Sequence, residues 1–185
     1  MKKDVGGTVR IGTLLVVFVF LLISGSLGQA EAQNPEAKNA QLIVNPVSVR
    51  LGVAKVMETD IVFTGTGFEP GDSVFIKLLG VPVNGEKKDL AIASADVEKD
   101  GTFTAPVGKL TKISDFLRGE IGENKKGKPA PVISRPPMPP GVYTAQAVSM
   151  LSGTRARCTL EVQKPSLLDR LKDWIGVRLG KIIKK

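Results

Sequence analysis

The sequence has no histidine, and this absence narrows the chemistry that the chain could perform. Ser-His-Asp and Cys-His nucleophile pairs, histidine general bases and histidine metal sites all require that residue. No S-x-x-K motif occurs, and no group of carboxylates stands out from a solvated surface. The sequence therefore predicts that the protein is not an enzyme, with no catalytic residue, no cofactor and no small-molecule substrate.

Cysteine and aromatic residues are also scarce. The single cysteine, Cys158, leaves no partner for an intramolecular disulfide, and its place in an alternating apolar run predicts a buried side chain. The one tryptophan lies in a basic C-terminal segment, and the one tyrosine is expected in the core. Because carbohydrate sites usually present aromatic platforms and nucleic-acid surfaces interleave aromatics with cations, we expect neither of these partners.

The N-terminus has the pattern of a secretory signal peptide. Three basic residues precede an apolar run of ten residues, 14–23, which is short against the roughly 20 that a membrane-spanning helix needs. Small residues at Ala30 and Ala32 place the cleavage before Gln33, so residues 1–32 are predicted to be removed. The mature protein is expected to be exported to a periplasm or the extracellular space.

Positive charge is concentrated in two segments of the chain. Residues 108–140 contain 7 basic and 3 acidic residues, and residues 164–185 contain 7 basic and 2 acidic residues. By contrast, residues 33–107 have 7 basic and 10 acidic residues, and residues 141–163 have 2 basic and 1 acidic. This distribution indicates localised basic surfaces on an otherwise near-neutral domain.

After a polar leader, 33–40, the chain alternates apolar and polar residues in short segments separated by turn residues such as Asn84-Gly85 and Asp100-Gly101. This pattern predicts an all-β fold, an immunoglobulin-like sandwich of seven strands over residues 41–163. Tyr143 is placed like the tyrosine of a tyrosine corner, whose hydroxyl bonds to upstream backbone. The expected strands are 41–50, 60–66, 73–79, 90–97, 102–107, 142–150 and 154–162.

An insertion at 108–140 interrupts the strand pattern. Apolar residues Ile113, Phe116, Leu117 and Ile121 have helical spacing, which predicts about two helical turns. The basic, proline-rich remainder is expected to be extended, with polyproline II character, as either a disordered surface insertion or a functional one. Its candidate contact residues are Lys125, Lys126, Lys128 and Arg135.

The last segment, 164–185, has the pattern of a basic amphipathic helix. Ser166 and Asp169 form an S-x-x-D capping box, and apolar residues follow at helical spacing. Such a helix either docks on its own domain or contacts a membrane or a partner groove. The candidate contact residues are Leu168, Leu171, Trp174, Ile175, Arg178, Leu179, Lys181, Ile182, Lys184 and Lys185.

Two short motifs have some features of ligand sites. The stretch "GTGFEPGD" at 65–72 misses the spacing of a dinucleotide fingerprint and no helix follows it, so it predicts a tight corner between strands. Asp96, Glu98 and Asp100 match only the first half of a calcium loop, because Val107 stands at the twelfth position. These three acids remain a weak calcium candidate beside the simpler interpretation of a hairpin turn.

The segments "VFTGTGFEPGDSVFI", "ASADVEKDGTFTAPV", "PPGVYTAQAV" and "GTRARCTLEV" resemble bacterial immunoglobulin-like modules of the IPT/TIG kind. The resemblance covers residues 42–162 apart from the insertion and rests mostly on turn residues. It implies the sandwich fold and an exported, non-catalytic module, and it does not extend to the insertion or the tail.

Together these features predict an exported binding or scaffolding module that attaches to an anionic membrane surface or a protein partner through its basic C-terminal helix. The alternative is an accessory subunit of a larger envelope complex that docks through the basic, proline-rich insertion. An enzyme is the weakest of the three hypotheses.

Overall fold

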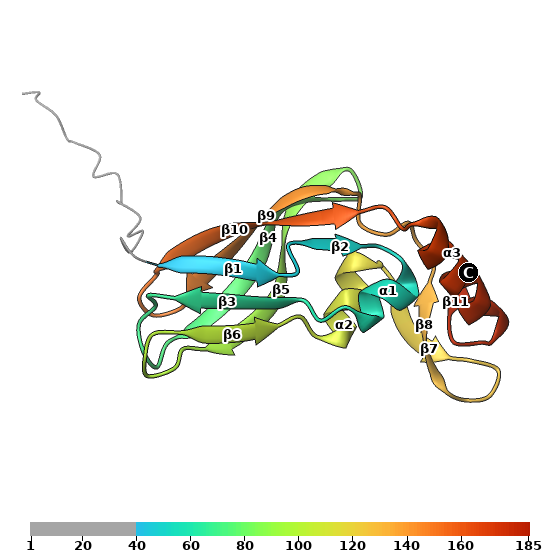
Figure 1. Cartoon of the computed structure of the whole chain (residues 1–185), viewed down its shortest axis with the longest axis horizontal. Helices are drawn as coiled ribbons and strands as arrows, with labels where there is room; N and C mark the ends of the chain where they lie inside the picture. Colours follow the sequence, from blue (N-terminus) through green and yellow to red (C-terminus); the bar gives the residue numbers. More distant parts are fainter. Residues whose placement is uncertain (1–39) are drawn as a thin grey trace, which may run out of the picture. The chain divides into compact units, whose positions relative to one another are not determined.

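The structure is a computed structural model that describes residues 40–185. The predicted signal peptide, 1–32, and all but the last residue of the predicted leader, 33–40, lie outside the described residues. Within them the secondary structure is mostly β-strand, arranged in three sheets (Figure 1). The expectation of an all-β protein is confirmed at this level.

The first sheet consists of β1 (Gln41–Asn45), β3 (Val62–Thr66) and β6 (Phe103–Pro106). The second consists, in spatial order, of β2 (Ser48–Arg50), β10 (Arg155–Gln163), β9 (Gly141–Ser149), β4 (Ser73–Val83) and β5 (Glu86–Asp96). The third consists of β11 (Ile183–Lys184), β8 (Pro129–Ile133) and β7 (Glu120–Glu123). The helical elements are α1 (Val53–Glu58), α2 (Lys109–Thr111), the π-helical turn η1 (Lys112–Phe116) and α3 (Leu167–Arg178).

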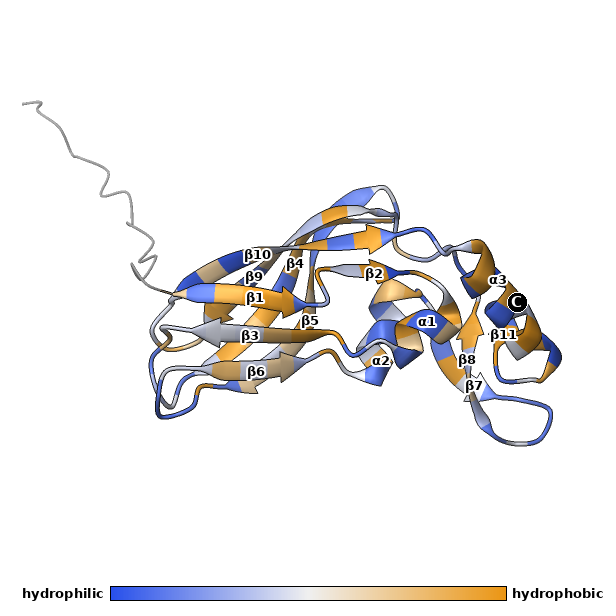
Figure 2. Cartoon of the chain, in the orientation of Figure 1, coloured by the Kyte–Doolittle hydropathy of each residue, from blue (hydrophilic) through white to orange (hydrophobic). Residues whose placement is uncertain are grey.

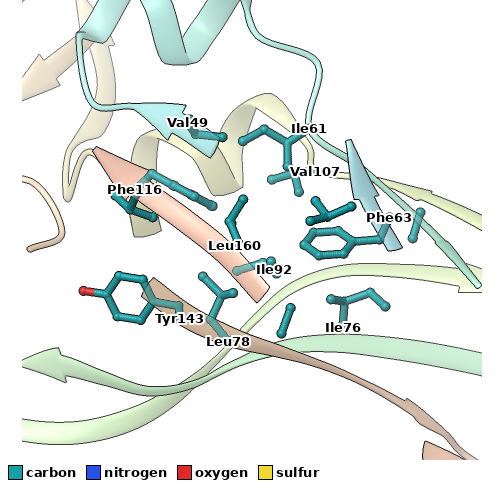
Figure 3. Close-up of a cluster of buried hydrophobic side chains, with 14 of the residues drawn as sticks. Val49, Ile61, Phe63, Ile76, Leu78, Ile92, Val107, Phe116, Tyr143 and Leu160 are labelled. Carbon is teal, nitrogen blue, oxygen red and sulfur yellow. The ribbon is translucent and has the colours of Figure 1, made fainter. Parts of the chain in front are cut away.

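Apolar side chains from the first two sheets meet in one core (Figure 3). Phe63 of β3, Ile76 of β4 and Leu160 of β10 are completely buried there. In β1, β3 and β6 every second residue is buried, because side chains alternate between the two faces of a sheet. Full burial of a side chain of this size contributes about 2 kcal/mol, so this interior is the main stabilising element of the domain.

The first predicted strand, 41–50, is two strands in the structure. Residues 41–45 pair with β3, whereas β2 runs parallel to the end of β10 in the other sheet. The change of sheet falls at Pro46, which has no N–H to donate to a ladder. The seven predicted strands therefore do not correspond one to one with those of the structure.

A long hairpin occupies one edge of the second sheet. Strands β4 and β5 extend several residues beyond the predicted 73–79 and 90–97 and meet at the predicted Asn84-Gly85 turn. Both turn residues have positive φ, 52° and 87°, which asparagine and glycine tolerate. The four charged residues that follow this turn, Glu86, Lys87, Lys88 and Asp89, are all exposed.

Asp72, at the end of the glycine-rich corner, connects that corner to the hairpin between β9 and β10. Its buried carboxylate accepts hydrogen bonds from the Ser149 hydroxyl and from the backbone N–H groups of Ser73, Leu151 and Ser152. Burial alone would raise the pKa of Asp72, but these donors hold it well below its usual range. The corner is a structural joint, as its residues predict.

In the β9–β10 hairpin, Tyr143 matches its predicted placement, and Cys158, predicted to be buried, is only partly so. The Tyr143 hydroxyl donates to the Pro139 carbonyl oxygen at 2.6 Å, four residues upstream. Cys158 lies on the same side of β10 as Ala156 and Leu160, half-buried, and burial raises the pKa of its thiol to about 11. The thiol therefore remains protonated at neutral pH.

The insertion is more regular than predicted. Helical turns cover only residues 109–116, and Ile121, expected on the same helix, lies in β7 with half of its surface exposed. Residues 120–133 form an antiparallel hairpin rather than an extended polyproline II segment. Strand β11 of the tail extends this sheet by pairing with the other edge of β8, at Val132 and Ile133. The insertion and the tail therefore form one structural unit, the insertion–tail unit, made of β7, β8, α3 and β11.

Candidate interaction surface

Helix α3 begins at the predicted capping box. The Asp169 N–H donates to the Ser166 hydroxyl at 3.1 Å, and the Ser166 N–H donates to the Asp169 carboxylate at 2.9 Å. These reciprocal bonds satisfy two backbone donors at the start of the helix. Burial alone would raise the pKa of Asp169, but the Ser166 hydroxyl and N–H, with the nearby charges of Arg50 and Lys55, lower it.

The face that α3 turns toward the rest of the domain is acidic. Its buried residues are Asp169, Asp173 and Gly176. The Asp173 carboxylate accepts from the Val53 N–H at 3.0 Å and from the Ala54 N–H at 2.9 Å. These are the first N–H groups of α1, whose own N-cap residue provides no side-chain cap. Asp173 therefore caps a helix that is distant in sequence, and this contact fixes how α3 is rotated on the domain.

A second polar contact supports the same orientation. The Asp169 carboxylate lies 3.4 Å from Nε of Arg50, at the end of β2. Arg50 is partly exposed, so the pair adds little to stability by itself. Because Asp169 and Asp173 lie one turn apart, the two carboxylates define one edge of the helix that must face inward.

The helix ends in a Schellman motif. The Lys181 N–H donates to the Gly176 carbonyl oxygen at 2.8 Å and the Gly180 N–H donates to that of Val177 at 3.1 Å. Gly180 has φ of 69°, a conformation that side chains disfavour. The chain then reverses so that Ile182 packs on Gly176, where a Cβ would lie only 2.7 Å from the Ile182 Cδ1 atom. The predicted single helix over 164–185 is thus a shorter helix followed by a return strand.

The outward side of α3 carries large apolar residues together with the exposed Arg170, Lys172 and Arg178, whereas an ordinary surface helix turns its apolar residues inward. Figure 2 shows hydrophobic and hydrophilic residues along the whole element. The hydrophobic ones are largely exposed, with 56% for Trp174 and 82% for Leu167. We call this exposed group the α3 apolar face: Leu167, Leu168, Leu171, Trp174, Ile175 and Leu179. A contiguous apolar surface on one element is typical of an interaction site.

Cations border the α3 apolar face. The Arg178 guanidinium lies 5.2 Å from the centre of the Trp174 ring, and Lys172 lies 3.8 Å from Glu58 of α1. Beyond the helix end, Lys184 lines a groove of about 600 Å³ with Lys125 and Lys126 of the insertion. The sequence placed these cations in two segments about 50 residues apart, and the fold brings them together.

Asn124 is the residue that joins the two basic segments. Its side-chain oxygen accepts from the Lys126 and Lys128 N–H groups, which closes the β7–β8 turn. Its side-chain nitrogen donates to the Gly180 carbonyl oxygen at 2.7 Å, at the end of α3. Nothing in the composition of the insertion had singled out this residue, because its role depends on a contact with the tail.

Several predicted contact residues lie elsewhere. Ile182 is 95% buried because it turns back under α3, so it is part of the core and not of the outward face. Arg135 lines a separate polar groove of about 350 Å³ with Arg118 and Asp115, and burial raises the pKa of the Asp115 carboxyl. Lys185 lies 3.4 Å from Glu120 of β7. Leu167, which the helical pattern had not selected, is the most exposed member of the apolar face.

The weak calcium candidate is not supported. Asp96 accepts from the Ser73 hydroxyl and Asp100 from the Thr102 hydroxyl, both at 2.7 Å, while the Glu98 carbonyl oxygen accepts from the Gly101 N–H. These bonds are those of a strand end and a tight turn. Across residues 40–185, no group of three or more potential ligands gathers in a way that could hold a metal ion.

No family model matches the chain, and the search of curated proteins likewise found no match. None of the helices within residues 40–185 has the length and apolar character needed to cross a membrane.

Proposed function

We propose that this protein is an exported, non-catalytic binding module that attaches to an anionic membrane surface through helix α3. The observation that carries the proposal is the orientation of that helix. It faces the domain with Asp169, Asp173 and Gly176, and it leaves six large apolar side chains to the outside.

The α3 apolar face has the composition of a helix that lies in a membrane interface. Leucine and isoleucine side chains enter the acyl boundary, tryptophan favours the headgroup level, and lysine or arginine at the margin contacts anionic headgroups. Helix α3 exposes Trp174, with the Arg178 guanidinium 5.2 Å from the centre of its ring, and it also exposes Lys172, so residues of all these kinds are present. An exposed apolar surface of this kind is costly in water, and a membrane interface removes that cost.

Charge complementarity favours a lipid surface. Lys125, Lys126 and Lys184 line one groove at the end of α3, so the basic residues of both segments are close to the apolar face. Each lysine or arginine near an anionic surface contributes about 1 kcal/mol to binding. The acidic 33–107 region forms much of the sandwich, so the charge distribution favours attachment by the insertion–tail unit.

Two further parts of the proposal rest on sequence. The N-terminal pattern, with an apolar run at 14–23 and small residues at Ala30 and Ala32, supports export to a periplasm or the extracellular space. The turn motifs of residues 42–162 support an immunoglobulin-like module related to the IPT/TIG kind. In this arrangement the sandwich is a scaffold that presents α3.

Vesicle flotation tests the proposal. The chain from residue 33 contains every described strand and the whole core, and it should float with phosphatidylglycerol-containing vesicles but not with pure phosphatidylcholine vesicles. Leu171→Ser should weaken vesicle binding by about tenfold, because it removes a leucine that would be buried in the membrane interface.

Leu151→Ser is the matched control, since Leu151 is an exposed leucine outside α3, on the β9–β10 hairpin, with 85% of its surface accessible against 52% for Leu171. This variant should float like the unmodified chain. Equal flotation by the Leu171→Ser and Leu151→Ser variants, or flotation with neither type of vesicle, contradicts the proposal and leaves a protein groove as the partner of α3.

A further inference from the structure

A groove of about 500 Å³ is lined by residues of α1 and α3 and by Pro131 of β8. It is distinct from the basic groove at the end of the helix, although both are lined by Leu179 and Ile182. Its size falls in the range of sites that bind small ligands, which is about 300–1,000 Å³.

The walls of this groove are apolar. Val53, Ala54 and Met57 line it from α1, and Ile175 and Leu179 line it from α3. Ile182 lies among them, 5% exposed. A cleft with this lining has no set of polar groups that could orient a polar ligand, so it selects for a hydrocarbon.

The charged residues of the groove are at its rim. Lys172 and Glu58 form an ion pair of 3.8 Å across one side, with more than half of each side chain exposed. Lys181 is on the rim as well, and it has no ion-pair partner among the residues that the structure describes. The net charge of this rim is therefore positive, which complements an anionic headgroup and disfavours a free hydrocarbon or a cationic lipid.

The groove is also continuous with the α3 apolar face. Ile175 and Leu179 belong to both, and they are 43% and 60% exposed. A lipid surface in contact with that face would therefore lie at the opening of the groove, with its acyl chains beside Ile175 and its headgroups at the level of the lysines.

We propose that this groove takes up one acyl chain of an anionic lipid from the membrane surface that α3 contacts, with the headgroup held at Lys181. The inference rests on the proposed function and adds a defined lipid site to a general surface attachment. Burial of each methylene strengthens such binding, so the affinity depends on chain length.

A titration with monomeric dodecyl phosphate, below its critical micelle concentration, tests the site by calorimetry in the absence of any vesicle. We expect one ligand per chain. Butyl phosphate should bind more than about tenfold more weakly, since far fewer methylenes are buried. Lys181→Gln should weaken the binding of dodecyl phosphate without changing the stoichiometry.

Ala54→Phe fills the groove and leaves the outward side chains of α3 in place. Its backbone N–H still donates to Asp173, so α1 keeps its cap. This variant should lose dodecyl phosphate binding and should bind phosphatidylglycerol-containing vesicles about tenfold more weakly than the unmodified chain. Met57→Trp, from the next turn of α1, fills the same groove. It provides a second test if circular dichroism shows that Ala54→Phe is unfolded.

Leu171→Ser is the matched control, because Leu171 does not line the groove. It should weaken vesicle binding and leave dodecyl phosphate binding unchanged. If both groove-filling variants still bind dodecyl phosphate, the groove is not the binding site. If they bind vesicles as well as the unmodified chain does, the membrane is not the source of the acyl chain. If the unmodified chain does not bind vesicles, the proposed function is refuted instead. Failure of the lipid site and failure of the proposed function are therefore distinguishable.

Discussion

The sandwich and helix α3 of the insertion–tail unit differ in where their apolar side chains point. In the sandwich, most of the large apolar residues face inward, and side chains such as Leu160 and Phe63 are completely buried. In α3 the apolar residues face outward, and carboxylates hold the helix to the domain. Hydrophobic patterning therefore fixes the arrangement of the sandwich, whereas specific hydrogen bonds fix that of α3. An amphipathic pattern identifies a helix, but it does not tell which face is covered.

Matched leucine substitutions give the largest expected contrast between the two regions. Leu160→Ala should lower the free energy of unfolding by about 3 kcal/mol, because it leaves a cavity in the core. Leu171→Ala, on the exposed face of α3, should change it by less than about 0.5 kcal/mol. Urea denaturation of the two variants measures both values. A loss of similar size in Leu171→Ala would show that the α3 apolar face is covered.

Acid should affect the sandwich through Asp72. Its folded-state pKa is lower than its unfolded-state value of about 3.9, so the unfolded chain takes up this proton first as the pH falls. The stabilisation is complete at neutral pH and declines as the pH drops below about 4. Asp72→Asn should therefore be roughly 2 kcal/mol less stable than the unmodified chain at pH 7, and the difference should shrink near pH 2. If the difference in stability between Asp72→Asn and the unmodified chain is the same at both pH values, Asp72 does not have this role.

The attachment of the insertion–tail unit should depend on Asp173. Asp173→Ala leaves the Val53 and Ala54 N–H groups without their acceptor, which should cost about 1.5 kcal/mol. Hydrogen exchange is the sharper measurement, because the amides of α1 should exchange faster while those of β9 and β10 remain protected. Arg170→Ala, three residues away and exposed, is the control and should leave α1 protected, because within the described residues Arg170 forms no ion pair with α1.

The smallest expected effect concerns the end of α3. Gly180→Ala places a side chain at a φ of 69°, which should cost about 1 kcal/mol. Thermal unfolding followed by circular dichroism measures it. Gly127→Ala, which has the same φ of 69° in the β7–β8 turn, should cost a similar amount. A much larger effect of Gly180→Ala would indicate that the Schellman motif also positions β11.

The sequence allowed the local features of the fold to be predicted, because their causes are local. The Asn84-Gly85 turn, the capping box at Ser166 and the bond from Tyr143 to upstream backbone all depend on residues within a few positions of one another. The mostly β character followed from alternation along each segment. Such features require no knowledge of distant contacts.

The features that were missed depend on distant partners. Helix α1 has six residues and no side-chain cap of its own, and its cap comes from Asp173, about 120 positions later. The hairpin of the insertion was predicted to be extended because Pro129 and Pro131 suggested polyproline II, yet β11 completes its sheet. Asp169, Asp173 and Gly176 do share one helical face, and that spacing was a signal for the buried side of α3 that apolar periodicity obscured.

Asn124 has a consequence for engineering. Because its side chain ties the turn of the insertion to the end of α3, neither basic segment can be transferred alone to another β-rich scaffold with its geometry intact. A transferable segment would have to contain the β7–β8 hairpin and the tail. It would also need backbone N–H donors equivalent to those at the amino end of α1, from which Asp173 accepts hydrogen bonds. The unit is therefore a three-part graft, and the smallest portable form of this surface includes residues from three separate stretches of the chain.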